Sequence, residues 1–438
     1  MSAAAPGLRT TADAIVAGTT SAAEVAEACL ARIAATDEAV QAWAFLDPEH
    51  VRRQAADADR ARRDGRPTGP LHGVPLAIKD VFDTADMPTE YGSPIHAGHR
   101  PRRDAWPVGR LRAAGAVIVG KSVTTEFAWY RPGKTRNPHD PARTPGGSSS
   151  GSAAAVGAGM VPGALGTQTN GSVIRPASYC GVVGFKPSHG LIARTGTLML
   201  SRALDHVGVF ARSVEDAALL AEVLAGDDAG DPDTRPSARP PLLATALGEP
   251  PHKPRIAFVR TAVWDQAEAT TRTAFEGLAA GLGIAEVVLP PAFDVGLDLH
   301  RTVADVEIAH YLAREYATSR DLLSEPLRTL IARGHTTPAP TYLAARAEVT
   351  TLAATLDALF DDCDVMLTPA ATGEAPRGLA ATGSPAFCTL WTLLGVPAIS
   401  LPLLKGPAGM PLGVQLVGRR GEDAKLLRTA RWLAKALA

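Results

Sequence analysis

Residues 144–189 read TPGGSSSGSAAAVGAGMVPGALGTQTNGSVIRPASYCGVVGFKPSH and hold two turns that are rich in glycine, serine and threonine. The first turn spans residues 146–150 and the second spans residues 169–172. Glycine adopts backbone conformations closed to other residues, and it lets main-chain N–H groups approach a ligand closely. The stretch between the turns, 153–166, is apolar and consists mainly of small residues. Because a flexible linker would be polar, these flanks predict buried turns that cradle a reactive group.

A serine in such a turn needs a base, because its hydroxyl is a poor nucleophile at its ordinary pKa. Neither turn contains a histidine, but the largely apolar run 71–78 upstream ends on the pair Lys79-Asp80. We interpret this run as a strand that delivers a lysine, since burial lowers the pKa of a lysine towards that of a neutral amine. The alternative is a solvated lysine–aspartate pair at a strand end.

These pieces together resemble the amidase signature family. The similarity covers the glycine–serine segment and further stretches that fall in the order of the family. Those stretches are 73–94, 104–129, 204–220, 361–376 and 393–423. The chain is therefore identified as a member of this family, which implies an α/β fold. The expected architecture is a single amidase-signature domain, with a large mixed β-sheet core covered by helices on both faces.

The resemblance implies a Ser-cisSer-Lys triad. Ser172 is the expected nucleophile, Lys79 is the expected base, and Ser148 is the bridging serine whose preceding peptide bond is cis. Such a triad cleaves an amide through an acyl-enzyme by moving protons between side chains. Neither a metal nor an organic cofactor is expected. The expected oxyanion hole consists of main-chain N–H groups in the second turn, those of Thr169, Asn170, Gly171 and Ser172.

The second turn departs at two positions from the usual family wording, G-T-D-T-G-G-S. Asn170 stands where glycine is usual, and asparagine tolerates left-handed φ better than other non-glycine residues. Gln168 stands where aspartate is usual, which removes a formal charge near Lys79 and predicts a shifted pKa of the base. The alternative for both positions is a neutral exchange in a packed environment.

Arg175 is a candidate for substrate recognition, because it follows Ser172 by three positions. This spacing resembles the malonamidase-like branch of the family, in which the arginine contacts a small substrate carboxylate. A planar guanidinium suits bidentate carboxylate recognition. The alternative is a structural ion pair with an acid such as Glu126. Three further residues are expected at the substrate, with a place in the core as the alternative for the two aromatics: Gly147, Tyr91 and Trp129.

The resemblance implies a small-molecule amide as the partner, and the composition adds no nucleic-acid or membrane partner. The 438 residues carry a net charge of −1, which gives no reason to expect a nucleic-acid partner. The four cysteines lack the spacing of a metal site, so free buried thiols are expected. The first residues lack a secretory signal and no apolar run is long enough to span a membrane, so we expect a cytoplasmic protein without a membrane partner. The sequence does not decide whether the protein forms a homodimer.

Hydrophobic periodicity and the positions of glycine and proline predict how the single domain, 1–438, is organised. Residues 61–226 form the expected catalytic core, 227–255 a loop or linker, 256–360 a helix-rich variable region that shapes the substrate pocket, and 361–438 the closing strands and helix. A capping box at Ser21 and Glu24 predicts a helix over 20–35. Another helix is expected over 104–114, followed by a strand over 116–121.

The sequence favours an amidase that hydrolyses the C–N bond of small amides, with carboxylate-bearing amides as one substrate class. A broad aryl-amide, ester or carbamate (urethane) hydrolase is the first alternative, because the triad serves all of these bonds. An amidotransferase A subunit is the second alternative, because it shares the triad.

Overall fold

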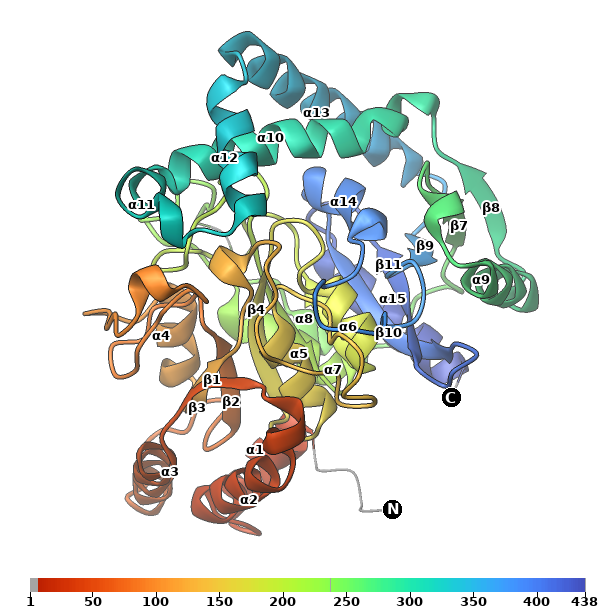
Figure 1. Ribbon diagram of the computed structural model, residues 1–438. Coiled ribbons are helices and arrows are strands. Elements are labelled where there is room, and N and C mark those ends of the chain that lie inside the picture. The colour runs from red at the N-terminus through yellow and green to blue at the C-terminus, as the bar shows by residue number, and fades with distance from the viewer. Residues whose placement is uncertain (1–6, 237, 438) are drawn as a thin grey trace.

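A computed structural model describes residues 7–236 and 238–437 (Figure 1). The strands are β1 (Trp43–Leu46), β2 (Pro75–Lys79), β3 (Val117–Ser122), β4 (Gly163–Gln168), β5 (Val183–Lys186), β6 (His206–Ala211), β7 (Ile256–Arg260), β8 (Ala285–Val288), β9 (Val365–Pro369), β10 (Ala398–Lys405) and β11 (Pro411–Val417). They form one mixed sheet of 11 strands in the order β1-β3-β2-β4-β6-β5-β10-β11-β9-β7-β8.

Helices cover the sheet and extend beyond one of its ends (Figure 1). They are α1 (Leu8–Ala17), α2 (Ala22–Val40), α3 (Pro48–Arg63), α4 (Trp106–Ala113), α5 (Ser150–Gly157), α6 (Ile174–Cys180), α7 (Val214–Leu224), α8 (Leu242–Leu247), α9 (Ala269–Leu282), α10 (Gly296–Tyr311), α11 (Ala313–Thr318), α12 (Glu325–Thr336), α13 (Ala339–Leu359), α14 (Ala386–Leu393) and α15 (Asp423–Ala436). The predicted helices over 20–35 and 104–114 correspond to α2 and α4, and the strand over 116–121 corresponds to β3.

Two apolar cores lie on opposite faces of the sheet, because successive side chains of a strand point to opposite sides. In β2, Ala77 belongs to the core that includes residues of α2 and α5, whereas Leu76 and Ile78 belong to the core that includes residues of α4, α7 and α15. Helices α5 and α6 pack on each other, as do α7, α8 and α15. The expectation of a mixed sheet with helices on both faces is confirmed.

The site is positioned by the pairing of β2 with β4. These strands are parallel, with Ile78 opposite Leu165, so their carboxyl ends reach the same edge of the sheet. Lys79 is the last residue of β2, and the turn that contains Ser172 begins directly after β4. Residues far apart in the sequence therefore meet at one edge, which is the usual place for a ligand site in an open α/β sheet.

Residues 256–360 combine two strands of the sheet with a group of helices. Strands β7 and β8 form the end of the sheet next to β9. Helices α10, α12 and α13 lie together above the rest of the chain in Figure 1, and α10 contacts α12, α13 and α14. A buried stripe on α10, His300, Val303, Ala304 and Glu307, has the spacing of one helical face.

The prediction of a loop over 227–255 is wrong for six residues, since α8 occupies 242–247. Leu242 and Ala246 are buried there, and α8 packs on α7 and α15. The high proline content around this helix hid it, because proline is more typical of loops. The prediction of free thiols is confirmed for all four cysteines. Within the described residues, none of the helices has both the length and the apolar character needed to cross a membrane.

Candidate active site

Lys79 is completely buried at the carboxyl end of β2. Its Nζ lies 2.7 Å from Oγ of Ser148 and 2.7 Å from Oγ1 of Thr167. Burial lowers the pKa of Lys79 well below its usual value, and the negative charge of Asp205 opposes this shift. The alternative of a solvated Lys79-Asp80 pair is excluded, since Asp80 instead forms an ion pair with Lys121 at 3.2 Å. A neutral amine in this position can accept a proton from a hydroxyl.

Ser148 lies two positions before the start of α5, and the peptide bond between Gly147 and Ser148 is cis. Gly146 precedes this bond with φ of +82°, a conformation that favours glycine. The two glycine-containing turns are joined by their main chains, because the Ser149 N–H donates to the Ser172 carbonyl at 3.4 Å. The turns that contain Ser148 and Ser172 therefore lie side by side.

The turn over 169–172 presents four consecutive N–H groups without a protein partner. In the described part of the chain, the amides of Thr169, Asn170, Gly171 and Ser172 donate to no acceptor, and the Ser172 hydroxyl also makes no hydrogen bond. Such buried N–H groups are costly to leave unpaired, so an array of them favours a site for a negatively charged or carbonyl oxygen.

The carbonyl groups of residues 169–171 all accept hydrogen bonds from other parts of the chain. His300 of α10 donates from Nε2 to the Thr169 carbonyl at 2.9 Å. Thr392 of α14 donates its hydroxyl to the Asn170 carbonyl at 2.5 Å. The Gly171 carbonyl accepts from the Arg175 N–H at 3.0 Å. The turn is consequently fixed by α10, α14 and its own helix, α6.

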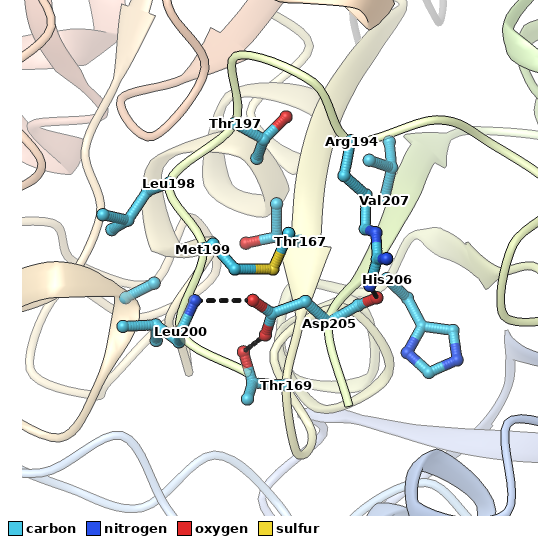
Figure 2. A pocket seen from close by; sticks show the side chains of 11 residues that line it. Thr167, Thr169, Arg194, Thr197, Leu198, Met199, Leu200, Asp205, His206 and Val207 are labelled. Atoms are coloured by element: carbon cyan, nitrogen blue, oxygen red, sulfur yellow. Dashed lines mark hydrogen bonds between the residues drawn. The ribbon is translucent and has the colours of Figure 1, made fainter. Parts of the chain in front are cut away.

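Asp205 lies behind the turn and lines a cavity of about 10 Å³, close to the space that one water molecule needs (Figure 2). Its carboxylate accepts from the Thr169 hydroxyl at 2.6 Å and from the Leu200 N–H at 2.7 Å, the two dashed contacts of that carboxylate in Figure 2. Burial raises the pKa of Asp205, and these hydrogen bonds oppose the shift. Thr167 also lines this cavity, and its hydroxyl contacts Lys79.

The two unusual residues of the turn have structural roles that the sequence did not indicate. Gln168 accepts the N–H groups of Val173 and Ile174 through Oε1, at 2.7 and 3.0 Å, and thereby holds the start of α6. Asn170 does not adopt positive φ, so the argument from left-handed conformation does not apply; its Oδ1 accepts from Thr389 at 2.7 Å. Gly171 is required by space, because a Cβ there would lie 2.9 Å from Cβ of Pro385.

Arg175 is buried and has no carboxylate partner among the described residues. It donates to the Gly147 carbonyl at 2.7 Å and to the Gly383 carbonyl at 2.8 Å. Its Nε is buried without a partner. The alternative of a pair with Glu126 is wrong, because one oxygen of Glu126 accepts from the Ser324 N–H and the other has no partner.

The other three residues expected at the substrate, Gly147, Tyr91 and Trp129, lie in different surroundings. Gly147 lies within the site, held by Arg175. The Tyr91 hydroxyl donates to Asp83 at 2.7 Å, so the polar end of this ring is engaged. Trp129 is buried in the apolar core and its ring contacts that of Tyr130 at a centroid distance of 5.0 Å, which matches the core alternative.

Four residues of the site were not predicted from the sequence: Thr167, Asp205, His300 and Thr392. Thr167 and Asp205 lie inside stretches already quoted for the family, but nothing in a single sequence shows which polar residue points inward. His300 lies in the variable region, where its position on the buried stripe of α10 was the available signal.

Comparisons with known proteins identify the family of the chain. A family model described as Amidase matches residues 24–427. The A subunit of glutamyl-tRNA(Gln) amidotransferase from Anaeromyxobacter sp. (strain K) is 36% identical, with 98% of this chain and 96% of the relative covered. Two solved structures cover nearly the whole of both chains. One, described as a vestigial protein complex that reveals the origins of an s-triazine catabolic enzyme, has a TM-score of 0.91, 32% identity and 98% coverage of each chain.

The other is the native peptide amidase from Stenotrophomonas maltophilia, with a TM-score of 0.85, 31% identity, and 99% of this chain and 97% of that one covered. The chain belongs to the amidase family, and its fold is that of the peptide amidase. It is an amidohydrolase of the amidase-signature type.

Proposed function

We propose that this protein hydrolyses small-molecule amides through a triad of Lys79, Ser148 and Ser172. The observation that carries the proposal is the contact between the buried Lys79 amine and the Ser148 hydroxyl, next to a turn with four unpartnered N–H groups. A neutral amine has one lone pair and two N–H groups. Both hydroxyls lie 2.7 Å from Nζ, and in the proposed resting state the lone pair accepts from Ser148 while an N–H group donates to Thr167.

The proposed reaction begins when Ser148 passes its proton to Lys79 and takes one from Ser172. The Ser172 oxygen then attacks the carbonyl carbon of the amide, and the oxyanion is held by N–H groups of the turn. Ser148 returns a proton to the leaving amine, which yields the acyl-enzyme. Water, deprotonated by the same relay, hydrolyses this ester. The oxyanion donors are those of Asn170, Gly171 and Ser172, with Thr169 at the edge of the turn.

The proposed substrates are amides that carry a carboxylate. A buried guanidinium without a carboxylate partner is costly, and Arg175 retains a partnerless N–H at Nε. A substrate carboxylate would supply the missing negative charge. Arg175 also holds the Gly147 carbonyl, so its removal is expected to slow turnover of every substrate to some degree. We further infer that residues 256–360 shape the substrate pocket within one domain.

The test measures ammonia or amine release from malonamate-like acids, neutral aryl amides, anilides and carbamates. Wild type, Arg175→Met and Arg175→Lys are compared. Recognition of a carboxylate predicts that Arg175→Met raises KM for the acids at least tenfold more than for neutral amides, as expected for loss of a charge-assisted hydrogen bond. Arg175→Lys should retain part of the preference because it keeps the charge. Equal losses on both classes would make Arg175 structural and favour the broad hydrolase.

A second candidate function is that of an amidotransferase A subunit. The specific observation is the 36% identity to such a protein over nearly the whole of both chains. The candidate predicts little release of ammonia from free amides but transfer of ammonia to glutamyl-tRNA(Gln) once its partner proteins are supplied. Hydrolysis of a small amide by the purified chain alone, without such transfer, would exclude it.

A further inference from the structure

His300 stands outside the triad and yet contacts the nucleophile turn directly. It is 3% exposed, and its Nε2 lies 2.9 Å from the Thr169 carbonyl oxygen. A carbonyl oxygen can only accept, so Nε2 carries the hydrogen in this contact. Burial lowers the pKa of His300 to about 4, which keeps the ring neutral at physiological pH. Its helix, α10, belongs to the variable region.

The contact fixes more than one atom, because a trans peptide group is planar. The carbonyl of one residue and the N–H of the next belong to the same plane and point in opposite directions. When His300 holds the Thr169 carbonyl, it also directs the Asn170 N–H away from α10. Thr392 directs the Gly171 N–H in the same manner, through the Asn170 carbonyl at 2.5 Å.

The side chain of Thr169 is held from another side. Its hydroxyl donates to Asp205 at 2.6 Å, a contact visible in Figure 2. Thr169 is thus fixed through its hydroxyl by the core of the domain and through its carbonyl by α10. Rotation of the peptide group between residues 169 and 170 would break the hydrogen bond to His300 and leave a buried donor and acceptor unpaired.

We infer that His300 is a positioning residue for the oxyanion hole: the variable region, through α10, sets the direction of the Asn170 N–H that stabilises the transition state. Thr392 of α14 does the same for the Gly171 N–H, and α10 packs on α14. The inference rests on the proposed function. It adds that the helices which shape the substrate pocket also contribute to the rate of the chemical step.

The test compares His300→Gln with His300→Met. Glutamine retains an N–H donor at about the same distance from the main chain, whereas methionine fills a similar volume without a donor. His300→Met is expected to lower kcat by about 10- to 100-fold, since a small misplacement of catalytic groups has effects of this size. KM should change less than threefold. His300→Gln should recover most of the lost kcat.

A second measurement separates positioning from packing. A boronic acid that forms a tetrahedral adduct with a serine should bind His300→Met more weakly, in proportion to the loss of kcat/KM, while the carboxylic acid product should bind both proteins alike. Ile308→Val is the matched control, since Ile308 is a buried residue of α10 that is absent from the site. It should leave kcat unchanged.

Unchanged kcat in His300→Met, or equal losses in the methionine and glutamine variants, would overturn the inference. If His300→Met fails to fold, Thr392→Val tests the neighbouring peptide group, with the same expected loss of kcat at constant KM. Failure of the proposed function looks different, because then Ser172→Ala retains the turnover of wild type. The two failures are therefore distinguishable.

Discussion

The carboxylate of Asp205 acts on the amine of Lys79, although no hydrogen bond joins the two residues. Both are buried, and Asp205 is the charged group that opposes the lowering of the Lys79 pKa. Asp205 is tied to the turn by Thr169, and Lys79 contacts Thr167, which lines the same cavity as Asp205. The sequence pointed to Gln168 as the position that tunes the base, but that side chain is engaged with the start of α6.

Asp205→Asn should move the acid limb of the kcat/KM profile to lower pH. The negative charge favours protonated Lys79, so its loss lowers the pKa of that lysine further and keeps the base neutral in more acidic solution. Asparagine can still accept from the Thr169 hydroxyl. Asp83→Asn is the control, since Asp83 is engaged with Tyr91 and should leave the limb in place. A shift of the acid limb to higher pH in Asp205→Asn would contradict the effect of Asp205 on Lys79.

Lys79→Met should abolish amide hydrolysis and yet stabilise the fold at neutral pH. Burial lowers the pKa of this lysine well below its usual value in the folded protein, whereas the unfolded chain binds a proton there below about pH 10.5, so the ionisation favours unfolding at pH 7. Methionine removes that cost. We expect kcat to fall by about 10⁴-fold or more and the thermal midpoint to rise. Measurable turnover by Lys79→Met would show that Lys79 takes no part in the proton relay.

Gln168→Leu should destabilise the protein by about 2–4 kcal/mol, because the N–H groups of Val173 and Ile174 lose their acceptor in a buried place. Gln168→Glu retains the acceptor and should recover part of this loss. Urea unfolding at constant m-value measures the difference. Equal stability of the leucine variant and wild type would show that α6 finds other partners.

The histidine contact should also be visible in the pH dependence of stability. The folded-state pKa of His300 is about 4, below its usual value of 6.5, because the ring is buried. The unfolded chain therefore binds the extra proton first, and stability falls as pH decreases from 6.5 to 4, by at most about 3 kcal/mol. His300→Gln should lack this part of the loss. Parallel stability profiles for the two proteins between these pH values would contradict the prediction.

The sequence was sufficient for the sheet, the helices on both faces and the residues that meet at its edge. Spacing alone placed Lys79 at a strand end and Ser172 in a turn, and the parallel pairing of β2 with β4 joins them. Helix α2 was predictable because its capping box is a local signal: the Ser21 hydroxyl accepts from the Glu24 N–H at 3.1 Å.

The residues that hold the turn were not predictable from the sequence, because their contacts join distant segments. His300 lies 131 positions from Thr169, and Thr392 lies 222 positions from Asn170. No local pattern indicates such partners. Arg175 was identified as a candidate, but its engagement with the Gly147 carbonyl depends on the fold of the first turn.

The segment between β7 and β9 leaves the sheet and re-enters it at adjacent strands, and its own strand β8 pairs with β7 at the edge of the sheet. Strand β7 ends at Arg260, β9 begins at Val365, and the two strands pair in parallel with Ala257 opposite Met366. We therefore expect the chain between them to act as an exchangeable cassette: its length and sequence can change while the register of the other strands is kept, if contacts with the rest of the chain such as that of Glu307 with Ser201 are retained. A graft of this cassette between relatives would carry new selectivity onto an unchanged lysine and serine pair, provided that it also brings a donor for the Thr169 carbonyl.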